Sequence, residues 1–390
     1  MDPQTSAKLR IFHITGAIFT LVGSIVGAGI LGIPYLMSKA GFLTGLLIIL
    51  LIVAFFIYTY LNLGEIILRY EGEHQLPGLV GMYLGQNGKS IMFIAMLMAA
   101  YGSLVSYYIA SGDAVVSLLS HYFNLQGIFG EPLFYSSLFF VLASLVILKG
   151  MNIIEDFELV ITGLIILTVV FIFGLSFRGI DSSNLGQFSL TTLHIPYGGI
   201  FFALMGFNAI PEAIRMLHRR VRYVPIVLIL GVLIPAILYI TFAVAIVGVM
   251  GPETQELGIL GMDTVLGPVA IIAGNIFILF SVTTSFLAIG FAQKNVFSLD
   301  YNLPDLFSWF LACAIPFLVF LSIRNVAGFV DVMSITGSIF GGVLVGLVLI
   351  ISYLSKNKSR KDAPYNIPMN LPVLIILLSL LVFGMATILI

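Results

Sequence analysis

Long apolar stretches recur along the whole chain, and short segments rich in charged and turn-forming residues separate them. Runs of about 20 apolar residues are the length that an α-helix needs to cross a bilayer. The segment 71–88 is too short and too broken to span, so we expect a loop with a short interfacial piece there. Cutting the sequence at charges, turn residues and prolines predicts eleven transmembrane helices, near residues 14–38, 41–68, 90–120, 132–150, 156–178, 197–217, 223–250, 264–293, 306–323, 326–353 and 370–390.

Two of these predicted helices contain residues that interrupt a helix. Residues 23–34 of the first read GSIVGAGILGIP, and residues 201–216 of the sixth read FFALMGFNAIPEAIRM. Glycine costs about 1 kcal/mol and proline about 3 kcal/mol in a helix interior, so both stretches predict unwound backbone. Unwound backbone is tolerated at membrane depth only where it is buried in protein or lines a cavity. A pair of such segments at corresponding positions indicates the binding site of a transporter.

The spacing of the two interrupted helices divides the chain into halves. They stand first and sixth, so they cross the membrane in opposite directions, and helices 1–5 and 6–10 form halves of inverted topology. We therefore predict an all-α polytopic membrane protein with one transmembrane transporter domain over residues 1–390. Its expected parts are a first inverted repeat at 12–178, a second at 197–353 and an additional helix at 370–390.

Composition and charge support a membrane protein and exclude a soluble one. Hydrophobic residues make up 60% of the chain and charged residues 9%, whereas soluble proteins carry about 25% charged residues. If the N-terminus is cytoplasmic, only Lys39, Arg178 and Arg324 of the 17 lysines and arginines fall outside. This bias predicts a multi-pass protein of the cell membrane with a cytoplasmic N-terminus and an extracellular C-terminus. The single cysteine, Cys313, excludes a disulfide framework and a thiolate metal site.

Three motifs carry a resemblance to a known family. SIVGAGILGIP is similar to the first-helix motif of the amino acid–polyamine–organocation superfamily, and GFNAIP and SVTTSFLAIG look like its amino acid/auxin permease branch. The resemblance covers helices one to ten by architecture, and helices one, six and eight by motif. It implies a five-plus-five inverted-repeat fold of the LeuT type, alternating access, amino acid substrates and coupling to sodium or protons.

The first interrupted helix is the expected seat of the charged groups of the substrate. The amides of Gly27, Ala28 and Gly29 open its second half, and a helix N-terminus attracts a carboxylate. The carbonyls of Ser24 and Ile25 end the first half, and we expect them to face the substrate ammonium. Close packing of small residues is the alternative, but it explains neither the proline of the motif nor the second break.

The sixth helix is expected to complete the substrate site. The resemblance implies that Phe202 is an aromatic gate over the substrate and that Ala203 and Gly206 leave carbonyls free around the amine. Asn208 stands where many amino acid permeases carry a glutamate. That departure argues against a proton relay at this position.

Helices two and three contribute further polar residues. Tyr107 and Tyr108 are candidates to touch the substrate carboxylate, and a tyrosine belt at the membrane surface is the weaker alternative because both lie deep in the helix. Acids inside membranes are expensive and frequently functional. Asp113 has no local basic partner, so it belongs either to a proton path or to a solvated outer position. Glu65 precedes Arg69 by four residues, which favours a structural ion pair over a proton path.

Helix eight carries hydroxyl residues at a spacing that suits a hard cation. The hydroxyls of Thr284 and Ser285 and the carbonyl of Ser281 supply three oxygens on one face. The resemblance implies that carbonyls of the first helix, here Gly23 and Val26, complete a sodium site. The alternative is that the hydroxyls bond back to carbonyls of their own helix. Helix five has no Lys or Arg beyond its ends, which favours sodium over proton coupling.

The combined prediction is a secondary active, ion-coupled carrier of neutral amino acids with bulky aromatic or aliphatic side chains. The five histidines form no HExxH motif, and tyrosine stands where the first glycine of a phosphate-binding loop would lie, so the sequence does not indicate an enzyme. A carrier of another small polar solute and a proton-coupled permease stay open as alternatives. The expected partners are the amino acid and the lipid bilayer, with no nucleic acid. The sequence does not determine the oligomeric state.

Overall fold

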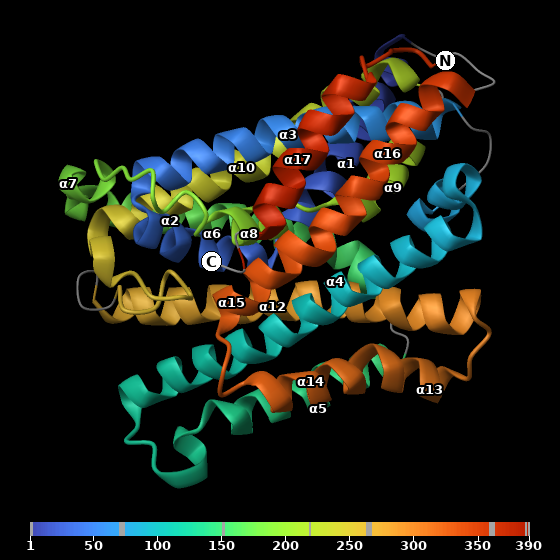
Figure 1. Cartoon of the computed structure of the whole chain (residues 1–390). Coiled ribbons are helices and arrows are strands. Elements are labelled where there is room, and N and C mark those ends of the chain that lie inside the picture. The colour runs from blue at the N-terminus through green and yellow to red at the C-terminus, as the bar shows by residue number, and fades with distance from the viewer. Residues whose placement is uncertain are drawn as a thin grey trace.

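The protein is a bundle of long helices that run roughly along one direction (Figure 1). The computed structural model describes residues 3–69, 75–149, 153–217, 220–262, 267–358, 363–386 and 388. Within these residues nine helices are long and apolar enough to cross a membrane, and a pair bent by 51°, His13–Ile25 and Ala28–Ala40, makes a tenth span. The expected all-α membrane fold with an interrupted first helix is confirmed.

The first half of the chain supplies five of these spans. A short 3₁₀ segment and α2 continue the first span after α1, and α7 lies in the loop that follows α6. The helices of this half are α1 (Pro3–Ile25), η1 (Ala28–Gly32), α2 (Ile33–Ala40), α3 (Phe42–Arg69), α4 (Leu76–Tyr122), η2 (Gly127–Gly130), α5 (Pro132–Lys149), α6 (Ile153–Ser176), η3 (Phe177–Gly179) and α7 (Ser182–Leu185).

The second half supplies the other five spans and a last apolar helix. Its π-helical segments η7, η8 and η9 continue neighbouring helices. The helices of this half are α8 (Tyr197–Ala203), η4 (Phe207–Ala209), α9 (Ile210–Met216), η5 (Val221–Tyr223), α10 (Val224–Met250), η6 (Gly251–Glu253), α12 (Pro268–Asn295), η7 (Val296–Asp300), α13 (Asp305–Trp309), η8 (Phe310–Ala314), α14 (Ile315–Ile323), α15 (Phe329–Ile335), η9 (Thr336–Gly341), α16 (Gly342–Lys358) and α17 (Leu371–Ala386).

The predicted eleventh helix is present, but it is shorter than the others. α17 has 16 residues, which corresponds to about 24 Å of helix against a hydrocarbon core of about 30 Å. These 16 residues are the described part of the helix, because residue 387 lies outside the described residues. Within the part of the chain that the structure describes there are ten full-length spans, and a crossing by α17 stays a prediction.

The loop expected at 71–88 is mostly helical in the structure. α4 begins at Leu76 and contains one non-helical residue, Gly85, with φ 69° and ψ −165°. Positive φ is accessible to glycine at no steric cost, so the chain turns there between a short helix and the long span. A short helix ends before Gly85, and its location at the membrane interface stays a prediction. Residues 70–74 lie outside the described residues.

The two interrupted spans lie side by side and run in opposite directions. A Cβ atom on Gly16 would lie 3.0 Å from Met216, and one on Gly29 would lie 2.9 Å from the Cα of Ala203. Farther along the first span, Leu36 contacts Gly199. The residue numbers rise on one span as they fall on the other, so the breaks face each other. The opposite directions agree with the expected inverted halves, whose boundaries stay a prediction.

The spans surround this central pair in two groups. α3 and α10 pack against each other and α10 packs against α1, whereas α4 packs against α5, α12, α14 and α16 (Figure 1). We call the end where α1 begins and α3, α9 and α12 finish the N-terminal end of the bundle, and the opposite end the distal end. The pair of interrupted spans thus lies between the α3–α10 group and the α4–α12 group.

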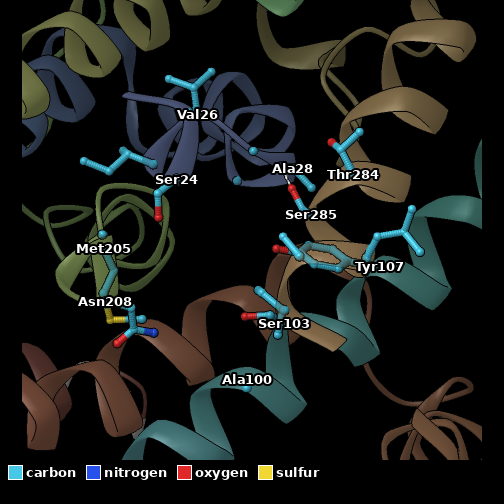
Figure 2. Close-up of a pocket in the computed structure, with 18 of the residues that line it drawn as sticks. Ser24, Val26, Ala28, Ala100, Ser103, Tyr107, Met205, Asn208, Thr284 and Ser285 are labelled. Carbon is cyan, nitrogen blue, oxygen red and sulfur yellow. Dashed lines mark hydrogen bonds between the residues drawn. The ribbon is translucent and has the colours of Figure 1, made fainter. Parts of the chain in front are cut away.

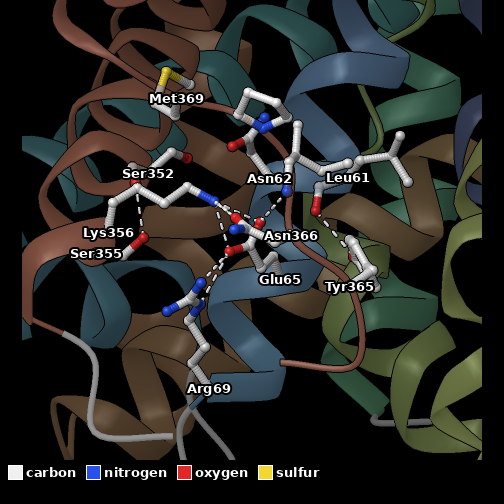
Figure 3. Close-up of polar contacts among 12 residues, drawn as sticks. Leu61, Asn62, Glu65, Arg69, Ser352, Ser355, Lys356, Tyr365, Asn366 and Met369 are labelled. Atoms are coloured by element: carbon white, nitrogen blue, oxygen red, sulfur yellow. Dashed lines mark hydrogen bonds and ion pairs between the residues drawn. The ribbon is translucent and has the colours of Figure 1, made fainter. Parts of the chain in front are cut away.

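A buried ion-pair cluster joins α3 to the C-terminal part of the chain (Figure 3). The Glu65 side chain is 1% exposed, and both of its oxygens lie 2.6 Å from the Lys356 ammonium at the end of α16. Arg69 donates to the same carboxylate, which forms the predicted i,i+4 pair, and the Ile367 N–H donates to it as well (2.8 Å). The Tyr365 hydroxyl donates to the Leu61 carbonyl (2.9 Å). These bonds hold the segment before α17 against α3.

Candidate functional site

A cavity of about 620 Å³ lies between the two breaks. Residues 23–29 of the first break and 202–208 of the second line it from one side, and α4, α6 and α12 line it from the other (Figure 2). Most of its wall is apolar, and its aromatic side chains come from Phe202, Phe207, Phe280 and Tyr107. Unwound backbone therefore lines a cavity here, as the sequence predicts.

The first break frees several carbonyl oxygens because its amides bond elsewhere. In a continuous helix the N–H groups of residues 27, 28 and 30 would donate four residues back. In this break the Gly27 N–H donates to the Ile25 carbonyl (2.9 Å), the Ala28 N–H to the Ser285 hydroxyl (3.3 Å), and the Ile30 N–H to the Gly27 carbonyl (3.4 Å). The carbonyls of residues 23, 24 and 26, which line the cavity, thereby lose their helical donors.

This arrangement modifies the expectation for the amides of the first break. Gly27 and Ala28 already donate hydrogen bonds, so only Gly29 offers an N–H that no acceptor among the described residues takes. The long bond from Ala28 to Ser285 is one that a carboxylate can replace, because hydrogen bonds to ionised acceptors are shorter and stronger. The Ile25 carbonyl is not free as expected, because it accepts from the Gly27 N–H and lies 2.8 Å from the Tyr239 hydroxyl.

The second break is held by two tyrosines from neighbouring spans. The Tyr239 hydroxyl also lies 2.9 Å from the Ala203 carbonyl, so this carbonyl, expected to be free, shares the single hydrogen of that hydroxyl with Ile25. The Tyr60 hydroxyl donates to the Leu204 carbonyl (3.1 Å) and accepts from the Gly206 N–H (2.6 Å). The Gly206 carbonyl accepts from the Ala209 N–H (3.2 Å). The backbone of this break is therefore largely satisfied by protein.

The sequence analysis missed Tyr60 and Tyr239. Both are completely buried in apolar helices, where their positions look like ordinary core positions. A buried tyrosine hydroxyl needs a partner, and in an unbroken bundle few backbone groups are free to provide one. The sequence did contain a signal for these contacts, because it places Tyr60 and Tyr239 deep in apolar helices and also predicts two breaks whose backbone groups need partners.

The side chains of Phe202 and Asn208 both face the cavity. Phe202 is 8% exposed, and a Cβ atom on Gly337 of η9 would lie 2.7 Å from its Cβ, so α8 packs closely against that element at this residue. Asn208 is exposed to the cavity, opposite Ala100 and Ser103 of α4 (Figure 2). Both residues line the cavity, and their contact with a substrate stays a prediction.

The two tyrosines of α4 have different environments. Tyr107 lines the cavity, in the same part of the wall as Ser285 and Ser103 (Figure 2). Tyr108 points away from the cavity, and its hydroxyl donates to the Cys313 carbonyl (3.1 Å) among the rings of α5 and α14. The expectation that Tyr108 touches the substrate is wrong, because successive residues of a helix face different directions.

Four of the five residues of the expected cation site line the cavity. Gly23, Val26, Thr284 and Ser285 belong to the lining, and Ser285 of α12 lies beside Ala28 of the first break (Figure 2). The Thr284 hydroxyl donates back to the Phe280 carbonyl (3.0 Å), which leaves its lone pairs free to face a cation. The carbonyls of Gly23 and Val26 lack helical donors, so these oxygens fit a hard cation. Ser281 lies outside the cavity lining, and its carbonyl lies 3.2 Å from the Thr284 hydroxyl. We therefore remove Ser281 from the expected cation ligands.

The two acids expected near a proton path do not line the cavity. Glu65 is paired with Arg69 and Lys356, which agrees with its structural interpretation. Asp113 is half-buried on the distal part of α4, beyond the last cavity residue of that helix, Tyr107. Neither acid meets the freed backbone of the breaks.

The cavity is asymmetric along α4. From Tyr107 its lining continues on this helix only toward the N-terminal end, as far as Met96. On the distal side the loop after α10 closes over the first break, where the Gly258 N–H donates to the Leu31 carbonyl (3.0 Å). The nearby Glu256 carboxylate accepts from the Val330 N–H at the start of α15 (3.3 Å). The loop thereby links the distal halves of two spans.

The tryptophan/tyrosine permease family matches residues 11–388, which is nearly the whole chain and includes both breaks. The chain belongs to this family. The permease is 24% identical over 385 residues to the tyrosine-specific transport system 1 of Haemophilus influenzae, and the match covers 94% of each chain. The family is one of transporters rather than enzymes.

Other relatives match shorter parts of the permease. It is 32% identical over 108 residues to the putative sodium-coupled neutral amino acid transporter 11 of Danio rerio, and the match spans 27% of the permease and 23% of that protein. It is 22% identical to the glutamine transporter 2 of Aliivibrio fischeri over 247 residues, or 61% of each chain. The match to the Danio rerio protein therefore covers about a quarter of the length of that protein.

A solved structure confirms the LeuT-like fold of the permease. The crystal structure of MhsT in complex with L-phenylalanine superimposes with a TM-score of 0.66 at 16% identity. The superposition covers 96% of the permease and 98% of MhsT. At this identity the likeness concerns the fold.

Proposed function

We propose that the permease is a secondary active carrier of aromatic amino acids, with tyrosine and tryptophan as its substrates. The observation that carries the proposal is the cavity between the breaks, which combines freed backbone groups with an apolar, partly aromatic wall. Family membership and the similarity to a tyrosine-specific transport system support the same substrate class.

The freed groups of the first break fit the two charges of a zwitterionic amino acid. The Gly29 N–H, and the Ala28 N–H once it releases Ser285, can donate to the substrate carboxylate at the start of a half-helix. The Ser24 carbonyl, which has lost its helical donor, can accept from the ammonium. The cavity holds no acidic or basic side chain among its lining residues, which favours a neutral side chain over a charged one.

The side chain of the substrate would extend toward α4. Ala99, Ala100 and Ser103 are small and leave room for a ring, and Met205 and Asn208 lie opposite them (Figure 2). Aromatic rings gain most from burial against apolar and aromatic surface, and Phe202 is positioned to cover the ring. This wall favours aromatic side chains over small ones.

Sodium is the coupling ion that the oxygen set favours. The freed carbonyls of Gly23 and Val26 and the hydroxyls of Thr284 and Ser285 are uncharged oxygen donors, which suit a hard monovalent cation. When bound, the ion would add a positive charge beside the first break and so strengthen the hold on a substrate carboxylate. Because Ser285 contacts both the ion position and Ala28, ion and substrate binding would be linked.

Transport would proceed by alternating access. The cavity extends along α4 toward the N-terminal end, which the distribution of Lys and Arg places in the cytoplasm of the cell, while the loop at Gly258 covers the distal side. To expose the site to the other side of the cell membrane, the loop at Gly258 would release the first break, and the interrupted spans would move against α4 and α12. Phe202 would close over the substrate during this movement.

Binding to purified protein tests the proposed substrate class. L-Tyrosine and L-tryptophan should raise the thermal unfolding midpoint in detergent, whereas L-lysine and L-glutamate should leave it unchanged, because the cavity lining offers no partner for a charged side chain. A matched titration in sodium and in potassium reports the coupling ion. Stabilisation by charged amino acids but not by aromatic ones would contradict the proposal.

A further inference from the structure

One hydroxyl group lies between the two breaks. Tyr239 of α10 places its hydroxyl oxygen 2.8 Å from the Ile25 carbonyl of the first break and 2.9 Å from the Ala203 carbonyl of the second. Both oxygens are hydrogen-bond acceptors, and a tyrosine hydroxyl has a single hydrogen to donate. The residue is completely buried, so water does not supply a second donor from bulk solvent.

The packing of α10 against α1 explains how Tyr239 reaches the first break. A Cβ atom on Gly231 would lie 2.8 Å from the Leu21 side chain, so the two helices approach closely two turns before the hydroxyl. Close approach at this glycine brings the backbone end of α1 within reach of a residue on α10. A larger residue at position 231 would separate Tyr239 from Ile25.

Tyr60 of α3 has a different pattern of bonds. Its hydroxyl donates to the Leu204 carbonyl and accepts from the Gly206 N–H, so its single hydrogen and one lone pair are both used. All of these partners belong to the second break. Tyr60 therefore fixes one break, whereas Tyr239 contacts both.

We propose that Tyr239 is a positioning residue that couples the two broken helices, through one hydroxyl hydrogen shared between the Ile25 and Ala203 carbonyls. The inference rests on the proposed function, because the breaks it joins are the two walls of the proposed substrate site. Rotation about the C–O bond of tyrosine moves the hydrogen from one carbonyl to the other without moving the ring. When the interrupted spans separate, the hydroxyl can stay with only one of them, and the carbonyl of the other loses this donor.

The shared hydrogen has a consequence for substrate binding. The substrate contacts proposed here come from both breaks, namely the Ser24 and Gly29 backbone from the first and Phe202 from the second. Without the hydroxyl, the Ile25 carbonyl keeps the Gly27 N–H, but the Ala203 carbonyl loses this donor and the link between the breaks is gone, so the breaks would move apart. The substrate would then have to restore their relative position on binding, which weakens its affinity.

The experiment compares three tyrosine-to-phenylalanine variants of the full chain. Tyr239→Phe removes the proposed coupling, and Tyr60→Phe removes the bonds within the second break. Tyr108→Phe is the matched control, because its hydroxyl is equally buried but donates to the Cys313 carbonyl outside the cavity. The measurements are affinity for L-tyrosine and L-tryptophan, the thermal midpoint, and amide hydrogen exchange without substrate.

The proposal predicts a distinct result for each variant. Tyr239→Phe should lower the affinity about tenfold, which corresponds to one lost hydrogen bond, whereas Tyr108→Phe should keep it. Exchange should speed up in peptides covering residues 22–32 and 203–209 for Tyr239→Phe, and only in 203–209 for Tyr60→Phe. A general loss of stability would instead speed up exchange along the whole chain.

Three outcomes would overturn the coupling role. They are wild-type affinity in Tyr239→Phe, faster exchange confined to a single break in that variant, and a uniform rise in exchange along the chain. If the wild-type protein binds neither L-tyrosine nor L-tryptophan, the proposed function fails, and the exchange measurement still decides whether Tyr239 holds both breaks.

Discussion

At the scale of single residues, the hydrogen bonds of three backbone amides determine the structure of the first break. The amides of Gly27, Ala28 and Ile30 donate to partners other than those of a continuous helix, and this frees three carbonyl oxygens at one place. Nearly all buried backbone groups in proteins are paired, so a concentration of freed ones is a site for a polar ligand. Ser285 is the residue through which this backbone meets α12.

The oxygen set at α12 leads to a prediction about ion coupling. Wild-type protein should bind L-tyrosine about 5- to 150-fold more tightly in sodium than in potassium, since coupling free energies are typically 1–3 kcal/mol. Thr284→Val and Ser285→Ala should each reduce this ratio toward one, because they remove hydroxyl ligands of the proposed cation site. Binding measured in the two salts at constant ionic strength checks the prediction.

The control for these variants is Thr168→Val on α6. The Thr168 hydroxyl also bonds back to its own helix, at the Leu164 carbonyl (2.8 Å), but it lies outside the cavity. The variant should keep the sodium dependence. Equal affinity of the wild-type protein in both salts, together with a dependence on pH, would contradict sodium coupling and direct attention to Asp113, tested by Asp113→Asn.

At the scale of elements, α3, α16 and the segment before α17 are joined by the Glu65 cluster. Two cations and one backbone amide converge on a carboxylate that is almost fully buried (Figure 3). Buried charges are tolerated when they are paired and hydrogen-bonded, and removal of one partner leaves the others uncompensated. The cluster therefore fixes the C-terminal helices to the α3–α10 group.

Two Glu–Arg pairs among the described residues have similar spacing along their helices and very different burial. Glu65→Gln should destabilise the protein by about 3–5 kcal/mol, because it leaves Arg69 and Lys356 without their counter-charge. Glu212 pairs with Arg215 on α9, and their side chains are 45% and 53% exposed. Glu212→Gln should cost less than about 1 kcal/mol. Thermal unfolding in one detergent compares the two, and equal midpoints would refute a stabilising role for the cluster.

At the scale of the whole molecule, the exposed surface of the long helices is apolar. Leu50 and Leu51 of α3 are 53% and 57% exposed, and Ile376 and Phe383 of α17 are 60% and 68% exposed. Water would disfavour such surfaces, and lipid tails accept them, so these helices face the bilayer. α17 therefore lies against lipid, whether or not it crosses the whole bilayer.

The direction of the bundle in the membrane gives the last prediction. A tag placed before Met1 should be protected in intact cells, because the distribution of Lys and Arg puts this end in the cytoplasm. A tag placed after Ile390 should be accessible from outside if α17 crosses the bilayer. Protease protection of both tags would show that α17 does not cross, and an accessible N-terminal tag would overturn the orientation.

Much of the fold could be predicted from the sequence because the bilayer imposes a length and a composition on every span. The ten long spans, the two breaks and the Glu65–Arg69 pair follow from apolar run length, from Gly and Pro positions and from i,i+4 spacing. The start of α4 was harder to predict, because a short helix and a turn at Gly85 look like a loop in a single sequence.

The sequence by itself determined that this chain spans a membrane, where its helices break and which of its backbone groups have no helical partner. Those properties are local, since they depend on residues close together along the chain. Only the tertiary structure decided which partners those groups take. It assigned the Ile25 and Ala203 carbonyls to Tyr239, the Ala28 amide to Ser285, and Glu65 to a second cation, Lys356. Ala203 and Tyr239 are 36 positions apart, and the other pairs are more than 200 apart. Residues so far apart meet only through packing, and a single sequence carries no periodic signal for such contacts.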